Sequence, residues 1–84
     1  MANIHNRISI FRIEKGLSRA ELAKRVEVNP QTIGFLERGT YSPSVELALR
    51  IAKELEVRIE DLFSLDPFPS LKSQLRTEGD KENG

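Results

Sequence analysis

Apolar residues in the first 65 positions recur every three or four residues, which is the spacing of amphipathic helices. The pattern predicts five short helices, over about residues 4–15, 18–26, 30–38, 45–55 and 59–64. No segment reads as a strand candidate, so we expect an all-α domain. The residues expected to form its core are Ile8, Phe11, Leu17, Leu22, Val26, Val28, Ile33, Leu36, Leu47, Ile51, Leu55, Leu62 and Phe63.

Capping residues mark where these helices begin and end. Ser18 and Glu21 have the spacing of a capping box, in which each side chain accepts from the other's backbone N–H. Asn29 followed by Pro30 begins the third helix, and Gly39 ends it. The second and third helices are separated by a three-residue turn and therefore predict a helix-turn-helix.

The second helix of such a motif lies in the major groove with its N-terminal residues at the base edges. Here Ile33 and Leu36 face inward. The residues left facing outward are Gln31, Thr32, Gly34, Phe35 and Arg38. Gln31 can pair with adenine and Thr32 with a base edge or a phosphate; the alternative is that both form ordinary solvated surface.

Gly34 and Phe35 add shape to this face. Without a side chain at Gly34, DNA could approach the helix backbone closely. Phe35 is a large apolar group on a face that should be wet, and contact with a thymine methyl would account for it. The alternative is a core role for Phe35 on a helix rotated from this orientation.

Residues that fit one known pattern are spread over about positions 4–65. They are Arg7, Ile8, Phe11, Arg12, Lys15, Gly16, Leu17, Ser18, Glu21, Leu22, Ala23, Val28, Thr32, Ile33, Leu36, Glu37, Arg38, Gly39, Pro43, Ser44, Leu47, Ile51, Ala52, Lys53, Leu55, Val57, Ile59, Glu60, Asp61, Leu62 and Phe63. This set at this spacing resembles the lambda-repressor/Cro-like, or XRE-type, helix-turn-helix regulators. The resemblance implies a five-helix DNA-binding domain of that fold.

The resemblance also implies which residues meet DNA. They are Arg19, Asn29, Pro30, Gln31, Thr32, Gly34, Phe35, Arg38, Thr40 and Tyr41. Arg19 stands where the family binds a phosphate, unless it is simply a solvated arginine at a helix start. Arg38, Thr40 and Tyr41 stand where the family's loop meets phosphate, although Tyr41 could instead cover the core.

Two further expectations are structural. The resemblance implies a buried ion pair between Arg12 and Glu37 that aims the recognition helix. Glu27 and Glu56 stand where the family commonly has glycine with a positive φ, so either they adopt this unfavourable backbone or the turns differ.

Residues 1–65 should form the DNA-binding domain, and residues 66–84 a tail whose end is disordered. Several apolar residues have no place in the predicted core: Ile10, Ile13, Leu65, Phe68, Leu71 and Leu75. Such a cluster calls for a cover. We expect either that the tail folds onto the first helix or that a partner, such as a second copy, covers it.

The 84 residues carry 13 basic and 13 acidic side chains, so the formal net charge is zero. The distribution is uneven. Residues 1–40 hold seven basic and four acidic residues, a net +3, whereas residues 41–84 hold six and nine, a net −3. The positive excess therefore lies in the helices expected to meet DNA, but it is modest, and we expect binding to depend on dimerisation and base contacts.

Composition excludes several other classes of protein. There is no cysteine, the only histidine is His5, and no set of residues suggests a catalytic site, so we expect neither an enzyme nor a metal or other cofactor. No apolar stretch approaches the ~20 residues of a membrane span, which points to the cytoplasm.

These observations predict a small transcriptional regulator, a repressor, that binds double-stranded DNA as a dimer on a palindromic operator. One variant is the controller of a restriction–modification system. The rival is an antitoxin that holds a toxin through Ile10, Ile13 and the tail.

Overall fold

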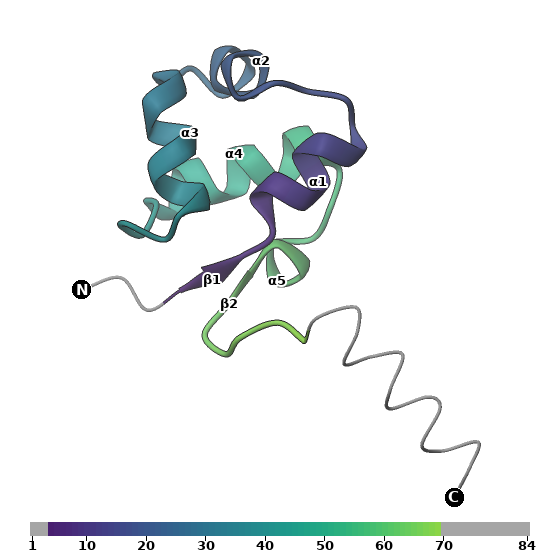
Figure 1. The fold of residues 1–84 in the computed structure, drawn as a ribbon, viewed down its shortest axis with the longest axis vertical. Helices are drawn as coiled ribbons and strands as arrows, with labels where there is room; N and C mark the ends of the chain where they lie inside the picture. Colours follow the sequence, from purple (N-terminus) through teal and green to yellow (C-terminus); the bar gives the residue numbers. More distant parts are fainter. Residues whose placement is uncertain (1–3, 70–84) are drawn as a thin grey trace, which may run out of the picture.

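The computed structural model describes residues 4–69, which form five helices and two short strands. The helices are α1 (Ile8–Glu14), α2 (Arg19–Arg25), α3 (Pro30–Glu37), α4 (Val45–Leu55) and α5 (Ile59–Leu62); the strands are β1 (His5–Asn6) and β2 (Phe63–Ser64). Figure 1 shows α2 across one end of the domain and the paired strands at the other. The expected five helices are confirmed.

The two strands correct the expectation that the chain has none. His5 pairs with Ser64 and Asn6 with Phe63 in an antiparallel ladder. A two-residue strand is too short to show an alternating pattern. Its partner lies almost sixty positions away, so the pairing depends on the fold bringing the two ends of the domain together.

The strands also shorten two predicted helices. α1 begins at Ile8 instead of near residue 4, because the preceding residues are in β1. The Asn6 side chain secures this start: its Oδ1 accepts from the Ile8 N–H at 3.1 Å, and its Nδ2 donates to the Leu36 carbonyl at 2.8 Å. α5 ends at Leu62 because the next two residues are in β2.

The predicted starts of α2, α3 and α4 are confirmed by their capping hydrogen bonds. Ser18 Oγ accepts from the Glu21 N–H at 3.0 Å, and the Glu21 carboxylate accepts from the Ser18 N–H at 2.8 Å. Hydrogen bonding of its carboxylate to Ser18, to the backbone N–H first and to the side chain second, holds the pKa of Glu21 below its ordinary value. Asn29 caps α3 and Ser44 caps α4 through side-chain oxygens.

Glu27 and Glu56 keep the turn geometry for which glycine is the usual residue. Their φ angles are 61° and 57°, which is left-handed backbone that favours glycine. Both turns therefore have the geometry implied by the family resemblance.

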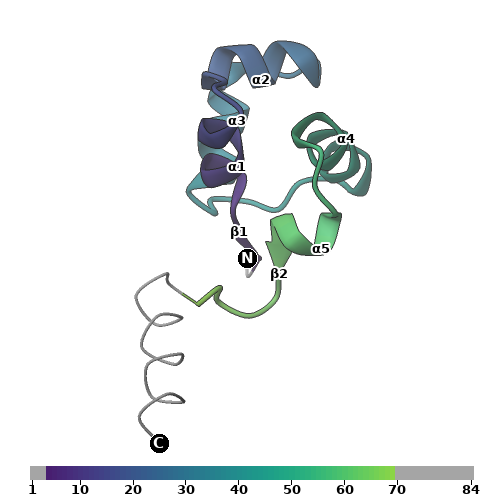
Figure 2. The same ribbon diagram turned by 90° about the vertical axis from the view of Figure 1, so that its right-hand side faces the viewer.

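The core lies between α1 and α3 on one side and α4 on the other, with α5 below, as Figure 2 shows. Every residue predicted for it is buried or packs against it. The fully buried large side chains are Ile8, Leu22, Ile33, Leu36, Ile51, Leu55 and Leu62. Ala48 and Ala52, which the prediction left out, are buried too, because small residues let α4 approach its neighbours.

The chain after β2 returns toward the start of α1. The Phe68 ring lies against Arg7, whose Cζ is 4.0 Å from the ring centroid. Leu71, Leu75 and the predicted disordered end lie outside the described residues. Within residues 4–69, no helix is long and apolar enough to cross a membrane.

Candidate nucleic-acid interface

Two buried residues set the rotation of α3. Ile33 is fully buried and Leu36 is 2% exposed, so the opposite side of the helix faces solvent. Gln31 and Arg38 are exposed, Thr32 is partly buried, and Phe35 is 40% exposed. Phe35 is therefore a surface residue and not part of the core, which settles the alternative left open by the sequence.

Gly34 differs from expectation. The residue is buried although it lies on the outward side of α3. The nearest atoms to a Cβ built at Gly34 belong to the Arg38 guanidinium, with Nη1 at 3.4 Å. The Arg38 side chain therefore occupies the space that was expected to be open to DNA at this position.

Arg38, Phe35 and Tyr41 form a stack at the C-terminal end of α3. The Arg38 Cζ lies 5.2 Å from the centroid of the Phe35 ring. The Phe35 and Tyr41 ring centroids are 6.2 Å apart, with planes tilted by 52°. Tyr41 is 40% exposed and packs on Phe35, so it is a surface residue rather than a cover for the core.

A shallow hollow joins the start of α2 to the outer face of α3. Its lining residues are Arg19, Pro30, Gln31, Gly34, Phe35 and Arg38. These residues contribute two guanidinium groups, an amide and the apolar side chains of Pro30 and Phe35, and none of them carries a carboxylate. This combination suits a phosphate beside base edges, because arginine pairs with anions and amides pair with bases.

Glu37 joins the hollow to the body of the protein. The expected ion pair is present, with Arg12 Nε 2.7 Å from Glu37 Oε2 and exposed side-chain fractions of 11% and 4%. Arg19 Nε lies 2.8 Å from Glu37 Oε1, a contact that the sequence did not reveal. Glu37 thus ties α1 and the start of α2 to the end of α3, while the Arg19 side chain stays 52% exposed.

The remaining predicted site residues lie at the two ends of α3. Asn29 is exposed, but its side-chain oxygen is already used, since it accepts from the Gln31 N–H at 3.0 Å. Thr40 is exposed in the following loop, and its N–H donates to the Phe35 carbonyl at 3.0 Å.

Asn6 is a supporting residue that the sequence reasoning missed. Its bond to the Leu36 carbonyl holds the end of α3 against the N-terminal segment. An asparagine just before an apolar helical pattern can form an Asx-turn with the N–H two residues on, and this local signal could have been noticed. Its long-range contact could not, since the two residues are 30 positions apart.

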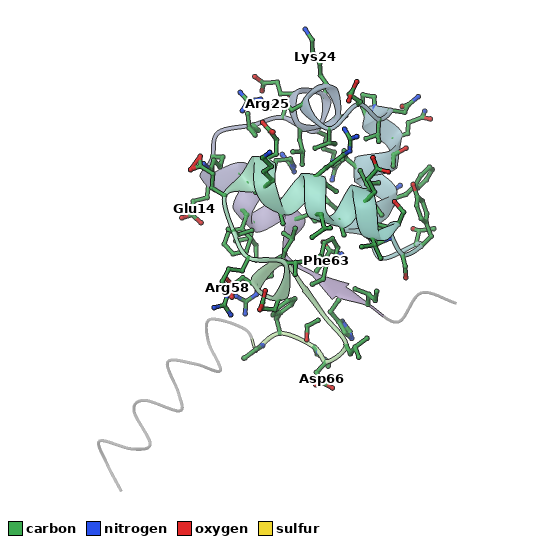
Figure 3. The ribbon with its side chains drawn as sticks, turned by 180° about the vertical axis from the view of Figure 1, so that it is seen from behind. Glu14, Lys24, Arg25, Arg58, Phe63 and Asp66 are labelled. Atoms are coloured by element: carbon green, nitrogen blue, oxygen red, sulfur yellow. The ribbon has the colours of Figure 1, made fainter. Side chains whose placement is uncertain are left out.

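The surface of α4 carries charge in a different arrangement. Arg50 donates to Glu46 Oε2 at 2.7 Å and to Glu27 Oε2 at 3.0 Å, and hydrogen bonding to these carboxylates raises its pKa. Figure 3 views the molecule with α4 in front, with Lys24 reaching outward from α2 and Arg58 lying beside α5. Among the described residues, Arg38 makes no such ion pair.

The geometry can be compared with known proteins. A family model described as Helix-turn-helix matches residues 8–62, which include all five helices. The chain belongs to the XRE-type helix-turn-helix family. An uncharacterized HTH-type transcriptional regulator of Archaeoglobus fulgidus is 49% identical over 63 residues, covering 75% of this chain and 90% of the relative. One from Methanothermobacter thermautotrophicus is 57% identical over 56 residues, covering 66% and 81%.

Solved structures share the arrangement of this XRE-type domain. The restriction–modification controller protein C.AhdI from Aeromonas hydrophila is 28% identical with a TM-score of 0.61, over 64% of this chain and 82% of that one. The clp gene regulator ClgR from Corynebacterium glutamicum is 33% identical with a TM-score of 0.60, over 64% and 70%. The relatives of this XRE-type protein are thus helix-turn-helix transcriptional regulators.

Proposed function

We propose that this protein represses transcription by binding a palindromic operator in double-stranded DNA as a homodimer, with α3 in the major groove. The observation that carries the proposal is the hollow on α3. It combines two arginines, an amide and an exposed aromatic ring on the side of the helix opposite its buried residues. Base edges and the phosphates beside them demand this mixture of groups.

Within this interface, base contacts come from the first turns of α3. The Gln31 amide matches the acceptor and donor of an adenine edge, and Thr32 reaches a base edge or a phosphate beside it. Pro30 has no side-chain donor and contributes shape. The exposed part of Phe35 fits against a thymine methyl group.

Phosphate contacts come from residues on both sides of α3. Arg19 uses Nε for Glu37 and has its terminal nitrogens left to bind a phosphate at the edge of the hollow. Asn29, Thr40 and Tyr41 are exposed at the two ends of the helix, where the sugar–phosphate backbone would pass.

A dimer follows from the small footprint of one helix. One recognition helix contacts only a few base pairs, so two copies spaced about 34 Å apart are needed for a long operator. The proposed contact surface includes Ile10, Ile13 and Leu65, which are 59%, 65% and 80% exposed. We propose that Phe68, Leu71 and Leu75, which follow in the sequence, belong to the same contact surface.

Selection from a pool of random duplexes tests the function. We expect enrichment of a palindromic site whose half-sites are one helical turn apart, and fluorescence anisotropy should show preferential binding over competitor DNA. Sedimentation at the same concentrations measures the dimer. The proposal fails if no duplex is enriched at low salt. A promoter fusion then separates repression from activation.

A second candidate function rests on the exposed isoleucines of α1. Helix surfaces that expose large apolar residues commonly bind protein. In this alternative a protein partner such as a toxin covers Ile10 and Ile13, and DNA binding is secondary. Copurification of a stoichiometric partner that is lost in the Ile10→Glu/Ile13→Glu variant would favour it. The likeness to C.AhdI supports a controller of restriction–modification genes as a further variant of the regulator.

A further inference from the structure

We propose that Arg38 reads a guanine in the major groove, with Gly34 and Phe35 forming the seat that holds its guanidinium. The inference rests on the proposed function and names a base that α3 recognises. It replaces the phosphate contact that the family resemblance implied for Arg38.

The direction of the Arg38 side chain carries the first step. Arg38 caps the C-terminal end of α3, where a side chain directed toward the following loop would meet phosphate. Instead, its Nη1 and Nη2 lie 3.4 and 3.8 Å from the Cβ position of Gly34, one turn back. Helical side chains lean toward the N-terminus, and this lean places the guanidinium in the hollow that Pro30 and Gln31 also line.

The seat is built from a missing side chain and a ring. Gly34 lies inside α3 without a positive φ, so the backbone does not require glycine there, and glycine weakens a helix relative to alanine. A Cβ there would lie against the guanidinium, 3.4 Å from Nη1, so a side chain larger than alanine would displace the group. The Phe35 ring supports the group from one side, with Cζ 5.2 Å from the ring centroid, and Tyr41 supports Phe35 in turn.

The guanidinium has no acceptor within the described part of the chain. No hydrogen bond or ion pair from the Arg38 side chain is present in residues 4–69, whereas the Arg12, Arg19 and Arg50 side chains each donate to a carboxylate. A planar fork held against a ring keeps its N–H donors free at the edge. The fork is therefore positioned before any ligand arrives, which lowers the entropy lost on binding.

Guanine is the base that this fork fits. In the major groove it presents two acceptors, O6 and N7, to a bidentate arginine, and this is the commonest specific contact in protein–DNA complexes. The position of the fork on the outer face of α3, within the hollow that contains Gln31, favours a base edge over the backbone.

The test uses the duplex selected by the wild-type protein, with each guanine replaced in turn. Substitution of 7-deazaguanine removes N7, whereas inosine keeps O6 and N7 and serves as the control base. We expect one position in each half-site where 7-deazaguanine weakens wild-type binding by about 5- to 100-fold and inosine does not. At that position Arg38→Ala should bind guanine and 7-deazaguanine equally.

Three variants separate the effect of the guanidinium shape from the effects of its charge and of the Phe35 ring that supports it. Arg38→Lys keeps the charge and should lose most of the preference for guanine. Phe35→Leu keeps an apolar side chain, removes the ring and should lose part of that preference. Arg58→Ala removes a positive charge beside α5 and is the matched control, with no expected change in base preference.

Two results would overturn the assignment while leaving the proposed function intact. The first is a selected site without an invariant guanine. The second is an Arg38→Ala variant that binds every duplex more weakly by the same factor and has a shallower salt dependence, as expected of a phosphate contact. If the wild-type protein enriches no duplex at all, the proposed function fails and this assignment fails with it.

Discussion

The outer faces of α3 and α4 both expose apolar side chains and an arginine, but the arginine has different contacts on each. On α3, Arg38 stacks on Phe35 and has no carboxylate partner in the described residues. On α4, Arg50 lies between Glu46 and Glu27 and donates to both. Val45 and Leu49 on α4 are 75% and 51% exposed, so α4 is at least as apolar at these two positions as α3 is at Phe35.

The comparison shows that neither exposed apolar area nor the number of basic residues identifies a nucleic-acid surface. A guanidinium that already pairs with two carboxylates presents little net positive charge to a phosphate or a base. A guanidinium held by a ring keeps its charge and its donors. The pairing of each cation therefore matters more than the zero net charge of the chain.

The largest expected difference between the two faces is in stability. Glu37→Ala removes the carboxylate that lies against Arg12, whose side chain is only 11% exposed, and leaves that cation uncompensated. We expect the free energy of unfolding, measured with urea, to fall by about 3–5 kcal/mol. Glu46→Ala on α4 is the control and should unfold close to the wild type. Equal midpoints for the two variants would show that the Glu37 network is no different from a surface ion pair.

A second expected difference is in sequence discrimination. Gln31→Ala should reduce discrimination at one base pair by about 1–3 kcal/mol, because the amide is the group that pairs with the base edge. Competition between the selected duplex and its single-base variants measures this. Arg50→Ala should leave discrimination unchanged. If Arg50→Ala loses as much discrimination as Gln31→Ala, then base reading is not confined to α3.

Arg19 sharpens the comparison by separating affinity from specificity. Arg19→Ala should weaken binding to all duplexes alike, because a phosphate contact carries no sequence information. The slope of log affinity against log salt concentration should become shallower by about 0.9 for the one phosphate released. Anisotropy titrations at several salt concentrations measure the slope. A loss of discrimination as large as that of Gln31→Ala would show that Arg19 reads a base.

The smallest effect concerns pH. Hydrogen bonds from Ser18 lower the pKa of Glu21, and the Lys15 ammonium lowers that of Glu56, both from an ordinary value of 4.5. The folded state therefore holds these protons more weakly than the unfolded state. The two carboxylates therefore add to the free energy of unfolding above the ordinary pKa, and this addition is lost as the pH falls from there through the lowered pKa values.

Thermal unfolding between pH 6 and pH 3 measures this loss. Glu21→Gln should flatten the profile slightly, because its amide has no proton to gain. The first turn of α3 has no acidic residue, so Gln31→Glu, which adds one, should steepen it instead. Identical profiles for the wild type, Glu21→Gln and Gln31→Glu would show that carboxylates at the helix starts do not cause the pH dependence.

Much of the fold could be predicted because its signals are local. Ser18, Asn29 and Ser44 cap their helices through atoms two or three residues away, and these starts agree with the structure. The strands were missed, because β1 and β2 have two residues each and pair only across the whole domain. Of the site, the sequence indicated which residues face outward on α3, since that depends on the same helical spacing as the core.

The amino-acid sequence by itself determined the helices, the core and the family, because short-range capping and apolar spacing act over a few residues. Only the tertiary structure decided which carboxylate pairs with which arginine. Glu37 meets Arg12 from 25 positions away and Arg19 from 18, so its double role depends on the packing of three helices. The seat of Arg38 is decided the same way, because Tyr41 supports Phe35 only after the loop beyond α3 has folded back.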